Sequence, residues 1–255
     1  MTQRIAILGG GRVGQAVARL LTSQWREVVV WVRSDSARAR ACEHGLKISS
    51  TVQEAASAAD VLLFAIPAGA LSEVVRAYSD AARGDHIVVH AVRGFCPGGS
   101  LILPHSVFRA ETCVRKIGVI GGPLYAPELA QGRPIGGVIA SRFDEVCDVV
   151  CELVRDSTIH LDASNDLVGV EVAGAMSHVV AIAGGIAEGL DAGDTARGIL
   201  VTHGLSEATR LGVALGGQAQ TFSGLAGVGD MIPRPLGASL RHRQFGYGLA
   251  KKKSF

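Results

Sequence analysis

Three glycines near the amino terminus have the spacing that cradles a phosphate. Gly9, Gly11 and Gly14 form a G-x-G-x-x-G pattern within the sequence GGGRVG. The first glycine permits a tight turn, the second lets the backbone approach a pyrophosphate, and the third lets a helix pack closely on a strand. N–H groups at the start of that helix attract phosphate oxygens. Together with Arg12 and Val13, these glycines predict a site for the pyrophosphate of a dinucleotide.

The elements around this turn have the order that such a site requires. Residues 4–8 (RIAIL) form a short apolar run, and residues 15–24 (QAVARLLTSQ) follow the turn with helical spacing. A second apolar run, residues 27–32 (EVVVWV), arrives about 20 residues after the turn, as a βαβ unit demands. A glycine-rich turn without a ligand is the alternative, and the strand–turn–helix context disfavours it.

The residues after the second strand bear on the choice of cofactor. NAD-specific proteins usually carry an acidic residue there, whereas this chain has Arg33 and Ser34. A guanidinium and a hydroxyl group suit a 2′-phosphate, so we expect NADP(H) to be preferred. Arg33 could instead stack on adenine and Asp35 could reach the ribose, which leaves NAD(H) possible.

Further strand patterns complete an N-terminal Rossmann domain, which we place at residues 1–163. Buried strands are expected at residues 60–67, 85–92, 116–123 and 136–141, with a helix at 145–155. Pro67 ends the first of these, at the edge of the sheet where ligands bind in doubly wound parallel folds. The polar stretch 162–166 (DASND) marks the crossing into a second domain.

The remaining residues, 164–255, are expected to form an all-helical domain. From Leu167 onward the apolar residues recur with helical spacing, and glycines such as Gly193 and Gly216 punctuate turns. The predicted fold class is therefore α/β, with a doubly wound parallel sheet followed by a helical domain.

Several motifs together resemble the NAD(P)-dependent glycerol-3-phosphate dehydrogenase family. The chain reads GAMSH at residues 174–178 where that family has GALKN, and GVGD at residues 227–230 where it has GLGD. It also has the family's W-x-R at Trp31 and Arg33, and GP-x-x-A-x-E at residues 122–128. The resemblance extends to about Gly248, whereas the family continues with further helices. It implies a dehydrogenase acting on a phosphorylated substrate, but the catalytic lysine is missing.

The family's site residues are only partly present. The resemblance implies that Asp230 is the aspartate beside the catalytic lysine and that Arg241 binds the substrate phosphate. Arg93 stands where the family has a lysine at the mouth of the active site, so it keeps the charge and changes its shape. Other positions differ: Ser177 replaces the lysine, His178 and His242 replace asparagines, and Arg234 replaces a threonine.

These replacements could support carbonyl reduction by another route. The reaction needs a proton donor and a cation near the developing alkoxide; His178 or His242 could provide the first and Arg234 the second. Ser177 could hydrogen-bond a substrate oxygen or pass a proton to His178 or Asp230. We therefore expect catalytic roles for His178, Ser177 and Asp230, and substrate binding by Arg241, Arg93, Arg234 and His242. A packing role for His178 and a solvated loop for Arg93 are the alternatives.

Composition excludes several other classes of protein. A chain of 255 residues with 48% hydrophobic residues is too apolar for disorder, and a formal net charge of +2 gives no basis for a nucleic-acid or membrane surface. The five cysteines have no metal-binding spacing, which favours a reducing, cytoplasmic compartment without a metal site. A homodimer is expected to cover apolar surface in the helical half.

The preferred function is NAD(P)H-dependent reduction of a small anionic carbonyl or imine, with phosphorylated substrates favoured by the resemblance. A catalytically silent NADP(H)-binding sensor or partner protein is the second hypothesis. A lyase or isomerase that uses a bound cofactor without net turnover is the third, and the residues neither support nor oppose it.

Overall fold

The computed structural model describes residues 3–24, 27–233 and 241–252, which form two compact units. The first unit comprises residues 1–120 and 124–167, and the second comprises residues 121–123 and 168–255. The expected domain boundary at 163/164 falls four residues before the division at Leu167.

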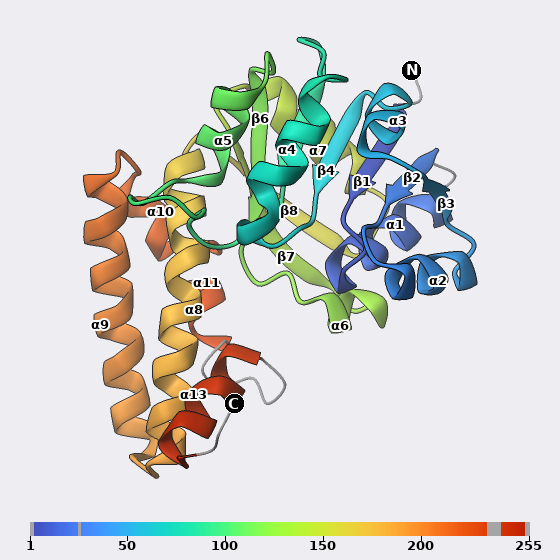
Figure 1. Ribbon diagram of the computed structural model, residues 1–255. Coiled ribbons are helices and arrows are strands. Elements are labelled where there is room, and N and C mark those ends of the chain that lie inside the picture. The colour runs from blue at the N-terminus through green and yellow to red at the C-terminus, as the bar shows by residue number, and fades with distance from the viewer. Residues whose placement is uncertain (1–2, 25–26, 234–240, 253–255) are drawn as a thin grey trace. The chain divides into compact units, whose positions relative to one another are not determined.

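The first unit is built on an eight-stranded, mostly parallel sheet with the order β3-β2-β1-β4-β5-β6-β7-β8 (Figure 1). Its strands are β1 (Ile5–Leu8), β2 (Val28–Trp31), β3 (Lys47–Ser49), β4 (Val61–Phe64), β5 (Ile87–His90), β6 (Lys116–Gly121), β7 (Ile135–Ser141) and β8 (Ile159–Ser164). The α-helices of this unit are α1 (Arg12–Ser23), α2 (Asp35–Glu43), α3 (Val52–Ser57), α4 (Leu71–Ser79), α5 (Pro104–Glu111), α6 (Ala126–Ala130) and α7 (Asp144–Val154). A 3₁₀ turn, η1 (Ala68–Ala70), precedes α4. The order, with β1 between β2 and β4, is that of a doubly wound Rossmann fold.

Both faces of the central strands are buried, which explains their continuous apolar sequences. On one face, Ile5 and Ile7 of β1 join the core cluster that includes residues of α1, α2, α6 and α7. On the other face, Phe64 of β4 makes edge-to-face contacts with Tyr78 of α4 and Phe108 of α5, at centroid distances of 5.6 and 4.8 Å.

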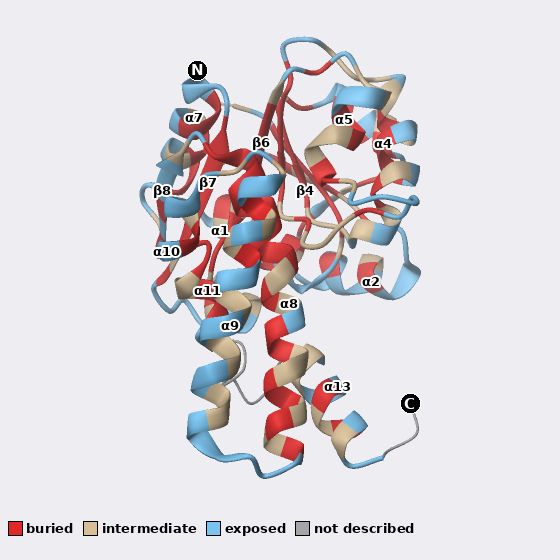
Figure 2. Cartoon of the chain, turned by 90° about the vertical axis from the view of Figure 1, so that its left-hand side faces the viewer, coloured by how far each residue is buried: buried red, intermediate tan, exposed pale blue. Residues whose placement is uncertain are grey.

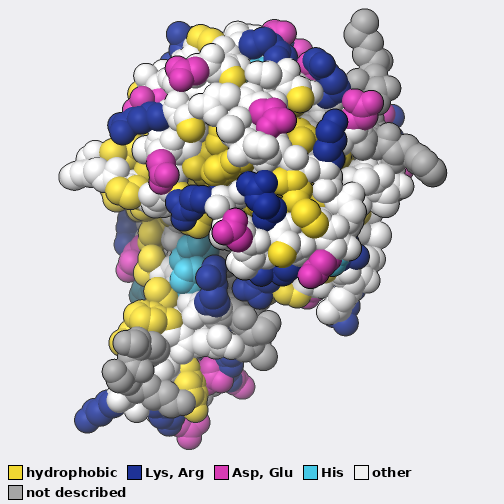
Figure 3. All heavy atoms as spheres, turned by 45° about the vertical axis from the view of Figure 1, so that its right-hand side comes forward, with side chains coloured by type: hydrophobic (Ala, Val, Ile, Leu, Met, Phe, Trp, Pro, Cys, Tyr) yellow, Lys and Arg dark blue, Asp and Glu magenta, His cyan; other side chains and the backbone are white. Residues whose placement is uncertain are grey.

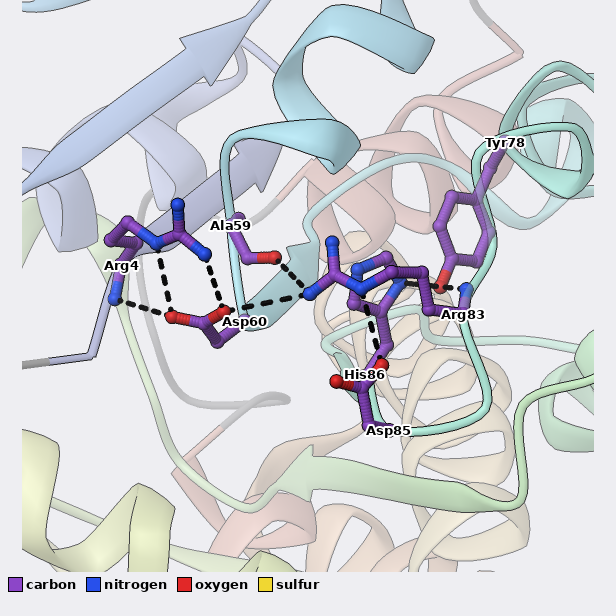
Figure 4. Close-up of polar contacts among 7 residues, drawn as sticks. All are labelled: Arg4, Ala59, Asp60, Tyr78, Arg83, Asp85 and His86. Atoms are coloured by element: carbon purple, nitrogen blue, oxygen red, sulfur yellow. Dashed lines mark hydrogen bonds and ion pairs between the residues drawn. The ribbon is translucent and has the colours of Figure 1, made fainter.

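A polar network joins the segments that lead into three parallel strands (Figure 4). Arg4, before β1, donates two side-chain hydrogen bonds to Asp60, before β4, and holds the pKa of that carboxyl group below its usual range. Arg83 donates to the Ala59 carbonyl at 3.1 Å. This network lies at the amino ends of the strands, so it leaves the carboxyl ends available for a ligand.

His86 lies fully buried beside this network. Its Nδ1 accepts hydrogen bonds from the Tyr78 hydroxyl at 2.7 Å and the Arg83 backbone N–H at 3.3 Å, which places the ring proton on Nε2. Burial, with the nearby Arg83 charge, lowers the pKa of His86. The ring is therefore held neutral.

The second unit is helical, and its two longest helices differ in burial (Figure 2). The helices are α8 (Leu167–Gly189), α9 (Gly193–Ala214), α10 (Ala219–Ser223), α11 (Val228–Met231) and α13 (Arg241–Ala250). By length and composition α8 could span a membrane, but 72% of its most apolar segment is buried within the protein. That burial explains its composition as that of a core helix. In contrast, the only buried residues of α9 are Ala208 and Gly212.

Two strands lie outside the sequence-based expectations. β3 was not anticipated, and part of the stretch expected as a domain crossing belongs to β8, which pairs in parallel with β7 along all six of its residues. Its exposed polar residues, His160 and Asp162, alternate with buried Ile159 and Leu161. The alternation shows that one face of β8 is solvated.

On the face drawn in Figure 3, side chains of both charge signs are interspersed.

Candidate active site

The glycine-rich turn joins β1 to α1 and is shaped by close backbone contacts. Gly9 has φ 134°, a value that disfavours any other residue, and a Cβ there would lie 2.3 Å from the Ala65 carbonyl oxygen. A Cβ at Gly14 would lie 2.0 Å from the Gly9 carbonyl oxygen. These two glycines are therefore required by the fold of the turn itself.

Gly11 differs from its neighbours because, apart from the adjacent backbone, no described atom lies within 4 Å of the position that its Cβ would take. It is the N-cap of α1, with φ −73° and ψ 175°, and no side chain caps the first turn of the helix. The N–H groups at this end carry the positive end of the helix dipole. Arg12 and Val13 are both exposed here. The open space at Gly11, the backbone N–H donors and the helix dipole at this end of α1 are therefore suited to binding a pyrophosphate group.

Gln15 also holds the turn in place, and sequence analysis did not identify it. Its side-chain amide donates to the carbonyl oxygens of Gly10 at 3.1 Å and Ala37 at 3.3 Å. The two bonds tie the turn to α2. Glutamine is common in helices, so the residue type alone gave no signal.

The expected cofactor-discriminating residues lie between β2 and α2. The Arg33 guanidinium is 3.5 Å from the Glu73 carboxylate, and both side chains are mostly exposed. Such a pair in water is weak and exchangeable. Ser34 is the N-cap of α2, and its hydroxyl accepts a hydrogen bond from the Ala37 N–H at 3.3 Å. Its hydroxyl thus already has a capping role.

The carboxyl ends of the strands border an apolar cavity next to α1. Its lining includes Val13 of α1, Leu63 of β4, Ala91 and Arg93 after β5, and Ile120 of β6. Pro67 is exposed just beyond β4, where it caps η1. The structure therefore brings Val13 and Arg93, 80 residues apart in the sequence, to one cavity beside the glycine turn.

In the helical unit, two of the expected residues meet directly. The rings of His178 on α8 and His242 on α13 are stacked, with centroids 4.0 Å apart and planes inclined by 20°. Both side chains are partly exposed. The two residues are 64 positions apart in the sequence, so their contact depends on the packing of the two helices.

Glycines allow α8 and α13 to approach closely. A Cβ at Gly185 would lie 2.0 Å from the Arg243 carbonyl oxygen, and one at Gly246 would lie 2.0 Å from that of Ile182. An ion pair between Glu188 and Arg243 also links the helices. Sequence analysis missed these residues; the spacing of small residues, Gly185-x-x-x-Gly189 and Gly246-x-Gly248, was the available signal.

The other expected residues of the helical unit have different environments. Ser177 is fully buried, and its hydroxyl donates to the Gly174 carbonyl within α8 at 2.9 Å. Asp230 is fully buried on α11, whereas Arg241 is exposed at the start of α13. Arg234 lies outside the described residues. Within the described part of the chain, no group of three or more His, Cys, Asp or Glu residues is arranged to hold a metal ion.

Comparison with known proteins identifies the family. Residues 4–147 match the family described as NAD-dependent glycerol-3-phosphate dehydrogenase N-terminus, and residues 166–255 match its C-terminus. Among curated relatives, the glycerol-3-phosphate dehydrogenase [NAD(P)+] of Paucimonas lemoignei is 39% identical, over 98% of this chain and 79% of that protein. The corresponding protein of Halothermothrix orenii is 33% identical, over 98% and 77%.

The fold agrees with this assignment. The crystal structure of glycerol-3-phosphate dehydrogenase from Coxiella burnetii superposes with a TM-score of 0.92 at 28% identity, covering 98% of this chain and 81% of that one. The resemblance of the motifs and the predicted fold class are thereby confirmed. The chain therefore belongs to the NAD-dependent glycerol-3-phosphate dehydrogenase family, whose members are NAD(P)-dependent oxidoreductases.

Proposed function

We propose that this chain uses NADPH to reduce a small phosphorylated carbonyl compound, with the His178–His242 pair supplying the proton. The stacked pair is the observation that carries the proposal. Dihydroxyacetone phosphate is the first substrate to test, because the curated relatives are named glycerol-3-phosphate dehydrogenases. The altered proton donor makes other phosphorylated or carboxylated carbonyl compounds, or imines, candidates as well.

The first unit binds the dinucleotide in this proposal. The open position at Gly11 and the first turn of α1 receive the pyrophosphate, as their geometry suits that group. Arg33 exchanges its exposed contact with Glu73 for the 2′-phosphate of NADPH, a charge-assisted and bidentate partner. NADPH is then preferred over NADH. When bound, the nicotinamide supplies the hydride.

The second unit supplies the proton that the carbonyl oxygen needs as it gains the electron pair. Two imidazolium rings with centroids 4.0 Å apart would repel by about 4 kcal/mol at an effective dielectric constant of 20. One protonated ring stacked on a neutral ring avoids this repulsion, and it is the arrangement that the proposal requires. We assign the donated proton to His178, with His242 as the ring that positions it and contacts the substrate. Asp230 is the third residue of the proposed catalytic group, a role that the resemblance to the family implies.

Arg241 holds the anionic group of the substrate in this proposal. It lies beside His242 at the start of α13, it is exposed, and it makes no ion pair with any other residue that the structure describes. Ser177 does not serve as the acid, because its hydroxyl points back to the Gly174 carbonyl within a buried part of α8.

Oxidation of NADPH in the presence of phosphorylated and carboxylated carbonyl compounds tests the reaction. With an active compound, His178→Ala should lower turnover by roughly two to four orders of magnitude while leaving NADPH affinity nearly unchanged. His242→Phe should keep most of the turnover because it preserves a ring that can stack on His178. His242→Ala removes that ring and should therefore have a lower turnover than His242→Phe.

Three outcomes would decide against parts of this scheme. Unchanged turnover in His178→Ala would refute its role as the donor. Equal loss in His242→Phe and His242→Ala would show that His242 itself transfers the proton. If NADPH binds but no compound is reduced by the wild type, the chain is a silent NADP(H)-binding protein.

We also propose a homodimer in the cytoplasm. Large apolar side chains are exposed on the long helices, among them Val179 on α8 and Ile199 and Val213 on α9, at 49–56% exposure. All five cysteines are free thiols, as expected in a reducing compartment. Light scattering of the purified protein would measure the mass, and a monomer at micromolar concentration would contradict the dimer.

A further inference from the structure

A second cavity in the first unit is lined by three arginines and a histidine. It has a volume of about 170 Å³ and is bordered by His105 and Arg109 of α5, Arg115, which precedes β6, and Arg142, which follows β7. Ile117, Phe143 and Leu167 form the apolar part of its wall. None of the described residues that line it is acidic.

This cavity is remote from the glycine turn. Strands β1, β4, β5 and β6 are parallel neighbours, so their amino ends share one edge of the sheet. Arg115 precedes β6 at that edge, whereas Gly9 and Arg93 follow β1 and β5 at the opposite edge. A ligand in the cationic cavity would therefore occupy a different place from the nucleotide.

The backbone that carries these cations is held by side-chain hydrogen bonds. The Ser141 hydroxyl donates to the Ile117 carbonyl at 2.7 Å and accepts from the Phe143 N–H at 3.2 Å, which fixes the segment around Arg142 against β6. Likewise, the Thr112 hydroxyl donates to the Phe108 carbonyl at 2.7 Å and accepts from the Val114 N–H at 3.2 Å, just before Arg115. The wall is thus formed before any ligand arrives.

The three arginines of the cavity are not paired with carboxylates of the described residues. Arg109, Arg115 and Arg142 form no ion pair with any residue in the described ranges. Two nearby carboxylates are already engaged, since Glu111 pairs with Arg76 and Glu145 pairs with Lys116. Three guanidinium groups around one cavity repel one another unless an anion lies among them.

We propose that this cavity binds the phosphate group of a small organic phosphate monoester. The planar donors of arginine match phosphate oxygens, and several such contacts to one group are strong. Phe143 and Leu167 provide an apolar surface for the organic part of the ligand, with Phe143 42% exposed in the absence of one. Inorganic phosphate can make the same contacts with the arginines, but it has no organic part to pack against Phe143 and Leu167.

Calorimetry with phenyl phosphate and with inorganic phosphate tests the site, with NADP⁺ present in saturating amount to fill the glycine turn. The wild type should bind phenyl phosphate several-fold more tightly than inorganic phosphate. In a variant that combines Arg109→Gln, Arg115→Gln and Arg142→Gln, the affinity should fall at least tenfold. The three arginines are exposed, so this variant should fold normally, as its thermal melting will show.

A matched control and a map of the binding position make the result decisive. Arg133→Gln removes an exposed arginine that does not line the cavity and forms no ion pair with any described residue, so this variant should bind like the wild type. Amide chemical shifts should change around residues 109–117 and 141–143 on addition of phenyl phosphate. The proposal would be overturned if the triple variant kept the affinity of the wild type for phenyl phosphate, or if Arg133→Gln lost as much affinity as the triple variant. It would also be overturned if phenyl phosphate changed no amide chemical shifts in these segments. Equal affinities for the two probes would show a site for free phosphate instead.

Discussion

Substitutions at Gly11 and Gly14 should separate a ligand-binding glycine from a structural one. Gly11→Val adds a side chain whose Cβ has no described atom within 4 Å apart from the adjacent backbone, and φ −73° with ψ 175° suits valine. We expect this variant to fold with a change in stability below about 1 kcal/mol. The side chain would nevertheless keep a pyrophosphate away from the amides of α1. The defect should therefore appear in NADPH binding and not in folding.

The structure sets the scale of both effects. Losing two charge-assisted hydrogen bonds, each worth about 1.5–3 kcal/mol, would cost about 3–6 kcal/mol, or at least about 100-fold in NADPH affinity. At Gly14, by contrast, a Cβ would approach the Gly9 carbonyl oxygen to 2.0 Å, where ordinary contacts are 3.4–4 Å. Because both atoms belong to the backbone of one turn, Gly14→Ala should cost about 3 kcal/mol, the upper end of the usual overpacking penalty.

Calorimetric titration with NADPH and thermal melting of the unliganded proteins would measure the two effects. Gly11→Val should melt with the wild type but bind at least about 100-fold more weakly. Gly14→Ala should melt about 6 °C or more below the wild type. Wild-type affinity in a folded Gly11→Val protein would refute the assignment of the pyrophosphate to this turn.

Four further substitutions test other parts of the structure. Arg33→Ala should reduce the affinity for NADPH much more than that for NADH in paired titrations, and equal losses would exclude a contact with the 2′-phosphate. Arg241→Ala should raise the KM of the active substrate with little change in NADPH binding, so an unchanged KM would remove it from the anion site. Gly185→Ala should lower the melting temperature and turnover together, since its Cβ would meet the Arg243 carbonyl at 2.0 Å and displace α13; unaffected melting would contradict the close packing. Because burial lowers the pKa of His86 in the folded protein, its neutral form contributes stability above the unfolded value of about 6.5. That contribution is lost as the pH falls below this value, so denaturant unfolding from pH 7.5 to 5 should show a weaker pH dependence in His86→Gln than in the wild type.

The local patterns of the sequence were sufficient to predict six of the eight strands of the Rossmann half and its glycine turn. Apolar runs that are buried on both faces, such as Val61–Phe64 in β4, need no distant information to be recognised as strands. The role of Gly14 likewise depends mainly on Gly9 in the same strand–turn–helix unit, whereas a Cβ at Gly9 would meet Ala65 and Ile66, which follow β4. In addition, the motifs GAMSH and GVGD were enough to indicate the family.

Only the tertiary structure determined which side chains meet. β8 forms because pairing with β7 provides a partner for a segment whose polar residues obscure its strand pattern. His178 and His242 stack because glycines let α8 and α13 approach to backbone contact. The cationic cavity gathers arginines from three separate segments, none of which forms a motif alone. Contacts of this kind depend on packing between elements far apart in the chain, and a local pattern carries no information about them.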